Sequence, residues 1–253
     1  MSFGSLARRK TVITGASSGI GRAIALEFAR AGADVVIHYR SSLAAAETVQ
    51  AECRQRGSST AIIARDFAEN SDVAAFVNQA WDLFRGIDVW VNNAGADLLT
   101  GPQAAIDYSQ KLGTLFEVDV RSTVLLSREV GRRMKEAGRG VILNIGWDQA
   151  ERGMEGASGE LFATAKAAIM GFTRSLAVSL APQVRVNCIA PGWVRTSWGQ
   201  QASEVWQNRV IRETPLARWG APEDIAWLAR FLASDEGAYI TGQVINANGG
   251  AVR

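Results

Sequence analysis

The sequence is poor in the residues that build disulfide frameworks, metal clusters or strongly charged surfaces. It contains two cysteines, one histidine and a formal net charge of +2. Cys53 and Cys188 lie far apart, in segments that read as a helix and a strand, which favours two buried thiols in a reducing compartment. The small charge gives no reason to expect nucleic acid or an anionic membrane as a partner. We predict no metal site.

Long apolar runs and linkers are scarce as well. No apolar run approaches the ~20 residues that span a bilayer, and no signal-peptide core follows the polar N-terminus, so we predict a cytoplasmic protein. No stretch rich in proline, glycine or serine divides the 253 residues, and no internal repeat is present. We therefore predict a single domain over residues 1–253.

What the sequence does contain is a regular alternation of short β-branched runs and longer helical stretches. The runs are apolar throughout, which is typical of a parallel sheet that helices cover on both faces. The predicted fold is α/β, a doubly wound Rossmann-type sheet of about seven strands. A polar and aromatic segment, 193–214, would overhang the carboxyl ends of the strands as a lid. The strands are predicted around 11–13, 35–37, 61–63, 89–91, 141–143, 184–186 and 244–245.

A glycine-rich turn joins the first predicted strand to the first helix. Glycine permits the tight turn and lets backbone N–H groups approach a pyrophosphate at a helix N-terminus. The alternative is a turn without a ligand, but the strand before it and the helix after it favour a dinucleotide. The candidate contacts are Gly15, Ser17, Ser18, Gly19, Ile20 and Gly21.

The end of the second strand distinguishes between cofactors. A carboxylate there would accept from the ribose 2′-hydroxyl of NAD, whereas an arginine accommodates the 2′-phosphate of NADP. The chain has Arg40, Ser41 and Ser42 at this point and no carboxylate. Arg40 could instead be a solvated surface residue, but its bidentate donors suit phosphate, so we predict NADP(H). His38 is interpreted as a structural residue rather than a catalyst.

With these motifs the chain resembles the short-chain dehydrogenase/reductase family over essentially its full length. The resemblance rests on the turn at 14–21, on 92–95 (NNAG), on 191–192 (PG) and on 248–250 (NGG), where the family usually has aspartate at position 248. It implies a homodimer or homotetramer formed through the helices near 116–136 and 161–180. It also implies cofactor contacts from Asp66, Phe67, Asn93, Ala94, Gly95, Lys166, Pro191, Gly192, Val194 and Thr196.

The resemblance breaks at the catalytic positions. The family uses asparagine, serine, tyrosine and lysine, and only Lys166 is retained; it could alternatively be a surface helix lysine. Asp119 stands for the asparagine, Trp147 for the serine and Phe162 for the tyrosine. Phenylalanine can neither donate nor accept the proton that accompanies hydride transfer. A positioned general acid is worth roughly 10²–10⁴ in rate, so ordinary carbonyl reduction should suffer badly.

Three functional hypotheses remain. The first is an NADP(H)-dependent oxidoreductase with altered chemistry, reducing a carbonyl or enoyl group of a small molecule. Its acid would be Asp119 or a carboxyl of the loop that contains Asp148, Glu151, Glu155 and Glu160, kept protonated by an apolar setting. The second is a catalytically impaired NADP(H)-binding pseudoenzyme that acts as a sensor or oligomer subunit. The third is a cofactor-free lyase or hydratase, against which Arg40 argues. The aromatics Trp147, Phe162, Trp193 and Trp198 could form a flat pocket or serve only as packing.

Overall fold

The computed structural model describes residues 3–69 and 72–252 of the chain. Its centre is a parallel seven-stranded sheet with the strand order β3-β2-β1-β4-β5-β6-β7, which confirms the predicted doubly wound fold. The order reverses between β1 and β4, and the carboxyl ends of these strands form the crevice where such sheets bind ligands. The strands are β1 (Lys10–Ile13), β2 (Asp34–Tyr39), β3 (Thr60–Ala64), β4 (Val89–Asn92), β5 (Gly140–Ile145), β6 (Val184–Pro191) and β7 (Val244–Ala247).

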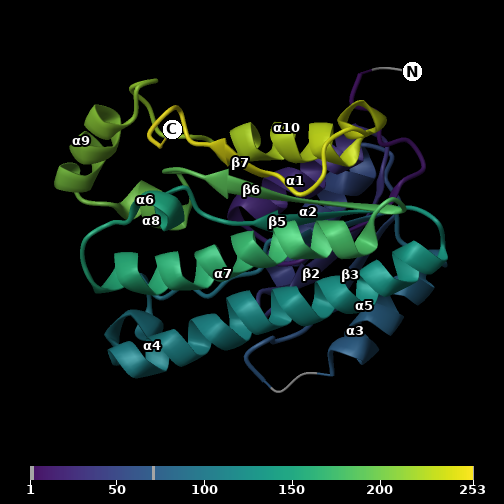
Figure 1. Ribbon diagram of the computed structural model, residues 1–253, viewed down its shortest axis with the longest axis horizontal. Coiled ribbons are helices and arrows are strands. Elements are labelled where there is room, and N and C mark those ends of the chain that lie inside the picture. Colours follow the sequence, from purple (N-terminus) through teal and green to yellow (C-terminus); the bar gives the residue numbers. More distant parts are fainter. Residues whose placement is uncertain (1–2, 70–71, 253) are drawn as a thin grey trace.

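Helices cover both faces of the sheet (Figure 1). One face packs against α1 (Gly19–Arg30), α2 (Leu43–Gln55) and α10 (Pro222–Ala233), with Phe28 and Leu232 buried between them. The other face packs against α3 (Val73–Phe84), α5 (Ser122–Glu136) and α7 (Ala157–Leu180), around the buried Trp90. Strands that are apolar on both sides are what this arrangement demands, because neither face of the sheet meets water.

The 24-residue helix α7 is long and apolar enough to cross a membrane, by length and composition alone. In the fold it lies along the sheet and packs against β6, with Ile169, Thr173 and Leu176 buried. A buried hydrogen-bond chain fixes it there: Asn92 Nδ2 donates to Asn144 Oδ1 (2.8 Å), and Asn144 Nδ2 donates to Thr173 Oγ1 (2.9 Å). Packing against the sheet accounts for the apolar composition of this helix.

The long helix predicted at 116–136 is more complex than the sequence pattern indicated. The structure has α4 (Tyr108–Leu115), a π-helical segment (Phe116–Arg121) and then α5. π-helical turns inside α-helices are frequently found at functional sites. This one carries Asp119 and turns it into the protein interior.

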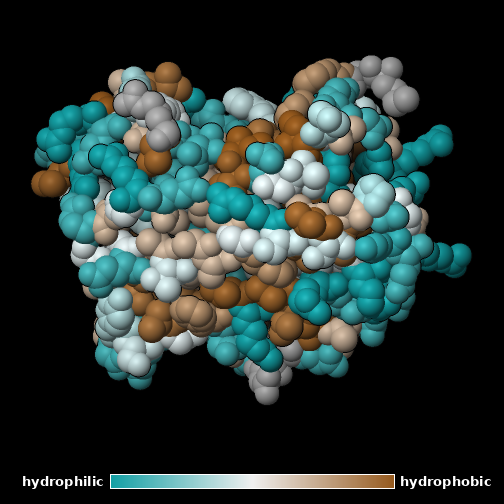
Figure 2. Space-filling model, viewed as in Figure 1, coloured by the Kyte–Doolittle hydropathy of each residue, from teal (hydrophilic) through white to brown (hydrophobic). Residues whose placement is uncertain are grey.

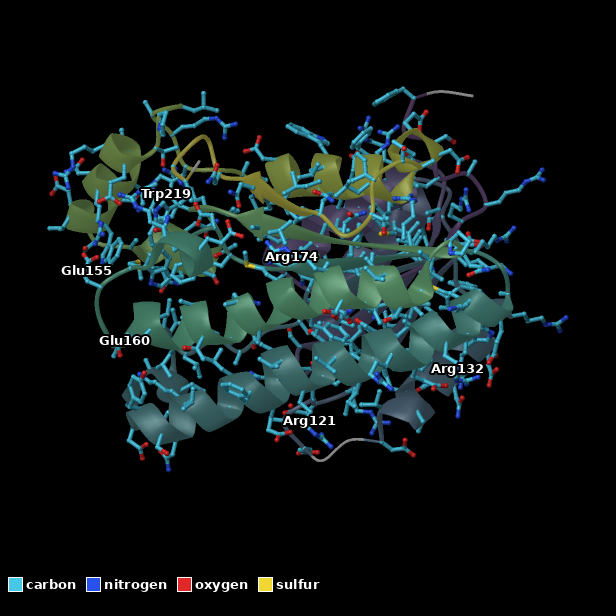
Figure 3. All side chains as sticks on the ribbon, in the orientation of Figure 1. Arg121, Arg132, Glu155, Glu160, Arg174 and Trp219 are labelled. Carbon is cyan, nitrogen blue, oxygen red and sulfur yellow. The ribbon has the colours of Figure 1, made fainter. Side chains whose placement is uncertain are left out.

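The remaining helices lie at the end of the sheet where β5 and β6 finish (Figure 1). The segment predicted as a lid, 193–214, contains α8 (Ser197–Gln201) and α9 (Glu204–Glu213), and the short α6 (Gln149–Arg152) lies in the chain between β5 and α7. Arg209 ties α9 to the loop after β5 through an ion pair with Glu155 (2.8 Å). Trp219 and Glu155 mark this end of the molecule among the side chains in Figure 3.

Candidate active site

The glycine-rich turn between β1 and α1 is closed by its neighbours. Gly15 and Gly19 have φ of +62° and +53°, values that favour glycine. A Cβ on Gly21 would lie 2.3 Å from the Gly15 carbonyl oxygen, so only glycine fits there. Asn93 Nδ2 donates to the carbonyl oxygens of Thr14 and Gly15, both at 3.0 Å. The turn therefore presents the N-terminus of α1 in a fixed position.

His38 supports this turn from the end of β2. The Gly15 N–H donates to His38 Nδ1 (2.9 Å), so the ring proton sits on Nε2, which donates to the Arg65 carbonyl oxygen (3.0 Å). The ring stacks on Phe67 with a centroid separation of 4.6 Å. Burial lowers the pKa of His38 to about 4, because it removes the charged form from water, and the hydrogen bond to the Arg65 carbonyl and the negative charge of Asp66 oppose this only in part. His38 is thus a neutral structural residue under the turn.

A cavity of about 410 Å³ extends from the turn across the ends of β2 and β4. Arg40, Ser41 and Ser42 form one end of it, and all three are exposed. Within residues 3–69 and 72–252, Arg40 makes no ion pair. Asp66 is turned into its own loop, where it accepts from the Ala68 N–H (2.9 Å). The cradle of turn glycines and the free guanidinium fit a dinucleotide that carries a 2′-phosphate.

Most residues predicted to hold the cofactor come together on this wall. Gly21 lies beneath the turn instead, and sequence reasoning missed His38, Arg65, Asp97, Val118 and Ser197, which also line the cavity. In the sequence these residues lie next to or near motif residues. The sequence alone does not show that their side chains line the same cavity. The predicted residues on the wall are Gly15, Ser17, Ser18, Gly19, Ile20, Arg40, Ser41, Ser42, Asp66, Phe67, Asn93, Ala94, Gly95 and Thr196.

A second cavity, of about 460 Å³, lies next to the first at the ends of β5 and β6. Ile20 and Thr196 line both cavities, so the two spaces adjoin. The other predicted contacts, Lys166, Pro191, Gly192 and Val194, line this second cavity, as do Trp147 and Phe162. Residues that the sequence did not point to also line it: Leu99, Ile145, Gly146, Met154, Ser158 and Trp206.

The walls of the second cavity are largely aromatic. Trp147 packs edge-on against Phe162 and against Trp193, each at 6.4 Å between centroids. Trp193 in turn contacts Trp206 of α9 at 5.3 Å and Trp198 of α8 at 5.9 Å. The rings come from the loop after β5, from α7 and from the segment 193–214, so tertiary contacts assemble them. Five of them face one space, which favours a pocket over incidental packing.

Lys166 and Asp119 form a buried ion pair behind this wall. Lys166 Nζ lies 2.9 Å from Asp119 Oδ2, and the two side chains are 13% and 1% exposed. Asp119 Oδ1 accepts from the Ala96 N–H (2.8 Å), and Lys166 Nζ also donates to the Ile145 carbonyl oxygen (3.3 Å). Both carboxylate oxygens are therefore engaged as acceptors, and Asp119 is not on the cavity wall. This geometry opposes the expectation that Asp119 supplies a proton to substrate.

The loop carboxyls also lie away from the second cavity. Glu151 pairs with Arg174, Glu155 pairs with Arg209, and Glu160 accepts from the Tyr108 hydroxyl. Among the residues that the structure describes, Lys166 is the ionisable side chain on the cavity wall, and no carboxyl group lines it. A reaction in this space has one charged group to use.

Asp148 is the one loop carboxyl that is buried. Burial raises its pKa, and the amide of Asn248 partly opposes this by donating to Asp148 Oδ2 (3.1 Å). Its Oδ1 has no partner within the described chain. The contact explains Asn248: an aspartate there would place a second carboxylate against Asp148. The amide and the carboxylate thus lock the C-terminal segment to the loop after β5.

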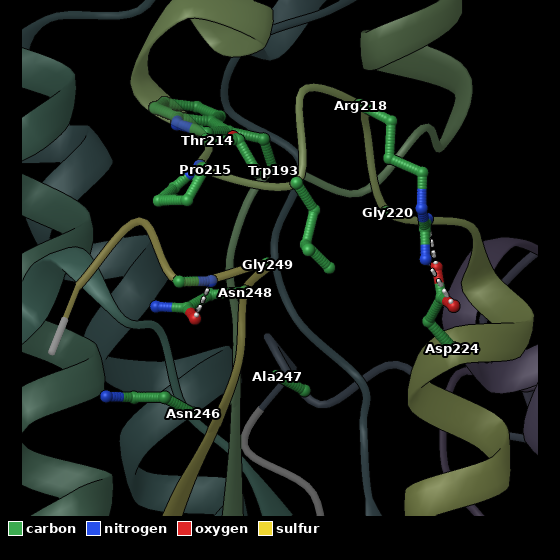
Figure 4. Close-up of a pocket in the computed structure, with 12 residues that line it drawn as sticks. Trp193, Thr214, Pro215, Arg218, Gly220, Asp224, Asn246, Ala247, Asn248 and Gly249 are labelled. Carbon is green, nitrogen blue, oxygen red and sulfur yellow. Dashed lines mark hydrogen bonds and ion pairs between the residues drawn. The ribbon is translucent and has the colours of Figure 1, made fainter.

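A further hollow, of about 510 Å³, has Trp193 among the residues that line it (Figure 4). Thr214, Pro215 and Asn248 line it, and the Arg218–Asp224 ion pair (2.7 Å) closes one side. Trp193 is shared by this hollow and the second cavity.

Comparisons with known proteins agree with this geometry. The sequence pattern of a family described as enoyl-(acyl carrier protein) reductase matches residues 15–252. A "short-chain type dehydrogenase/reductase" of Picea abies is 37% identical, with 98% of this chain and 93% of that protein covered. The chain belongs to the short-chain dehydrogenase/reductase family, a class of oxidoreductases.

Solved structures of the family superpose closely. A 7α-hydroxysteroid dehydrogenase in complex with NADH and 7-oxo glycochenodeoxycholic acid has a TM-score of 0.89 and 31% identity, covering 98% of this chain and 96% of that one. A short-chain dehydrogenase from Burkholderia cenocepacia, in complex with NADP, has a TM-score of 0.88 and 30% identity, covering 97% and 98%. Relatives with this fold thus hold either nicotinamide dinucleotide.

Proposed function

We propose that the protein is an NADP(H)-dependent reductase of a small molecule whose active site works without the family's tyrosine and serine. The observation that carries the proposal is the pair of adjoining cavities. One is a polar cradle ending at Arg40, and the other is an aromatic pocket with Lys166 on its wall. The structure in complex with NADP supports the choice of cofactor by likeness.

In this proposal the residues of the first cavity hold the dinucleotide. The backbone N–H groups of the turn at 15–21 bind the pyrophosphate at the N-terminus of α1, where the helix dipole favours negative charge. Arg40, with Ser41 and Ser42, binds the 2′-phosphate. Lys166 donates to the nicotinamide ribose, and Asp119 holds the lysine in place through the 2.9 Å ion pair. When bound, the cofactor supplies a hydride at the junction of the two cavities.

The aromatic pocket performs the other tasks of the reaction. Trp147, Phe162 and Trp193 orient a flat substrate beside the junction and exclude water from it. The segment 193–214 acts as a lid, since it contributes Trp198 and Trp206 to the pocket. We also propose that the protein acts in the cytoplasm.

A homo-oligomer is proposed as the working assembly. Figure 2 shows hydrophobic side chains at the surface over α5 and α7. Val178 of α7 is 81% exposed, and Phe116, the first residue of the π-helical segment before α5, is 41% exposed. Exposed apolar residues on long helices favour association with a second copy.

The cofactor assignment is tested by calorimetric titration with NADPH and NADH. Arg40→Ala should weaken NADPH by roughly 10- to 100-fold, the worth of charge-assisted hydrogen bonds, and leave NADH little changed. Arg54→Ala, an exposed arginine of α2, is the matched control. Equal losses for both cofactors would remove the 2′-phosphate role. Tight NADPH binding without turnover of any carbonyl, enoyl or iminium compound would favour the cofactor-sensor alternative.

A further inference from the structure

In the described part of the chain, the second cavity has no carboxyl or phenol group that could give a proton to a substrate during its reduction. Its polar side chains in the described part of the chain are Ser158, Thr196, Lys166 and the tryptophan indoles. Phe162 lies on the wall beside Lys166 without a hydroxyl. Lys166 is already committed to Asp119 and to the Ile145 carbonyl. A substrate whose oxygen must be protonated during reduction therefore lacks a suitable general acid in this cavity.

The same walls are well suited to a positive charge. Trp147, Phe162, Trp193, Trp198 and Trp206 line the space, and the face of an indole attracts cations. Two rings of the surrounding cluster already hold cations: Arg209 lies 4.8 Å from the Trp206 ring centroid and Arg195 lies 5.9 Å from that of Trp219. A ligand cation in the cavity would meet aromatic faces on several sides.

The positive charge of Lys166 would repel a cationic ligand if Lys166 had no acidic partner. Asp119 is that partner. Asp119 Oδ2 lies 2.9 Å from Nζ, within a largely buried pair. The pair is neutral as a unit, so the repulsion that a ligand cation feels from Lys166 is largely cancelled. Asp119 thus makes the cavity tolerant of positive charge.

We propose that the substrate is an iminium ion on a flat, apolar framework. This inference rests on the proposed reductase function. Hydride from the nicotinamide cofactor forms a C–H bond at the iminium carbon, and the C=N π pair returns to nitrogen. The substrate is reduced to a neutral amine, the cofactor is oxidised, and no proton is taken up. The missing acid, the aromatic walls and the Asp119 charge all serve this one reaction.

The first arm of the test measures turnover. N-methyl-dihydroisoquinolinium carries a permanent iminium, and tetralone is a neutral bicyclic ketone of similar size. With NADPH, the iminium should be reduced above its uncatalysed rate and at least about tenfold faster than tetralone. Its rate should be flat with pH above neutrality. Faster reduction of tetralone, or of a cyclic enone, would overturn the proposal.

The second arm measures binding and does not depend on turnover. With NADP⁺ saturating, calorimetry compares N-methylisoquinolinium with isoquinoline in its neutral form. The cation should bind roughly 3- to 30-fold more tightly, the range expected for one or two desolvated cation–π contacts. Trp193→Leu and Asp119→Asn should each lower this ratio, and Trp227→Leu, a 54% exposed residue of α10, should not. Equal binding of the two compounds would overturn the proposal.

The cofactor titrations show separately whether the underlying reductase proposal fails. If neither NADPH nor NADH gives a binding isotherm, the reductase proposal fails and the iminium proposal fails with it. If NADPH binds and the neutral compounds are preferred in both arms, the iminium proposal alone is refuted.

Discussion

Stability between neutral and mildly acidic pH should depend on His38. Burial depresses its pKa from 6.5 to about 4. Between these two pH values His38 binds a proton in the unfolded chain but not in the folded chain. The contribution of His38 is therefore complete above about pH 6.5 and is lost as the pH falls toward about 4. The full shift corresponds to roughly 3 kcal/mol, and the loss between about pH 7 and about pH 5 is roughly 2 kcal/mol. Because the chain has one histidine, no other imidazole shares this effect.

The assay is urea unfolding followed by tryptophan fluorescence at several pH values, all at or above about pH 5 so that few carboxyls titrate. His38→Asn is the control variant, because its Oδ1 can still accept from the Gly15 N–H while the side chain does not titrate. The raised pKa of Asp148 acts in the opposite direction and stays in both proteins. An unfolding free energy that is flat over this range, or an equal slope in His38→Asn, would refute the reasoning.

Three further predictions concern the second cavity and the core. Phe162→Tyr should raise tetralone reduction, by up to roughly 10²-fold, because a phenol then stands beside Lys166; no gain in steady-state assays would show that Trp147 blocks the approach. Asp119→Ala should lower the free energy of unfolding in urea by about 3–5 kcal/mol, since it leaves the charge of Lys166 buried without its partner; a loss below about 1 kcal/mol would contradict this. Cys53 and Cys188, whose pKa values burial raises to about 11 and about 12, should react with a thiol reagent only in unfolded protein; rapid labelling of the native state would show that they are accessible.

Much of the fold could be read from local patterns. Strands β1 and β2 follow from apolar β-branched runs, and the turn at 14–21 follows from glycine positions that the observed φ angles require. These features depend on short-range sterics and on burial of a whole strand, which few residues are enough to specify. Helix ends were less accurate: α7 begins at Ala157 rather than 161, and the π-helical segment interrupts the predicted helix at 116–136.

The chemistry of the site was harder to predict. The sequence pointed to Asp119 as an acid because an isolated carboxyl in an apolar setting would hold a proton. The π-helical segment instead brings it to Lys166 across 47 residues of chain, and the pair leaves the carboxylate nothing to donate. The loop carboxyls likewise meet arginines and an asparagine that are distant in sequence. Such pairings depend on how helices and loops pack, which no local pattern encodes.

The sequence by itself determined the parallel sheet, the glycine-rich turn and the aromatic side chains at positions 147 and 162. Those features belong to single segments, whose backbone or side-chain chemistry is the same in any packing. Only the tertiary structure decided that aromatic rings from three separate segments face one space, and that Asp119 offsets the charge of Lys166. Distances between segments set both outcomes, and these distances arise only when the whole core is assembled.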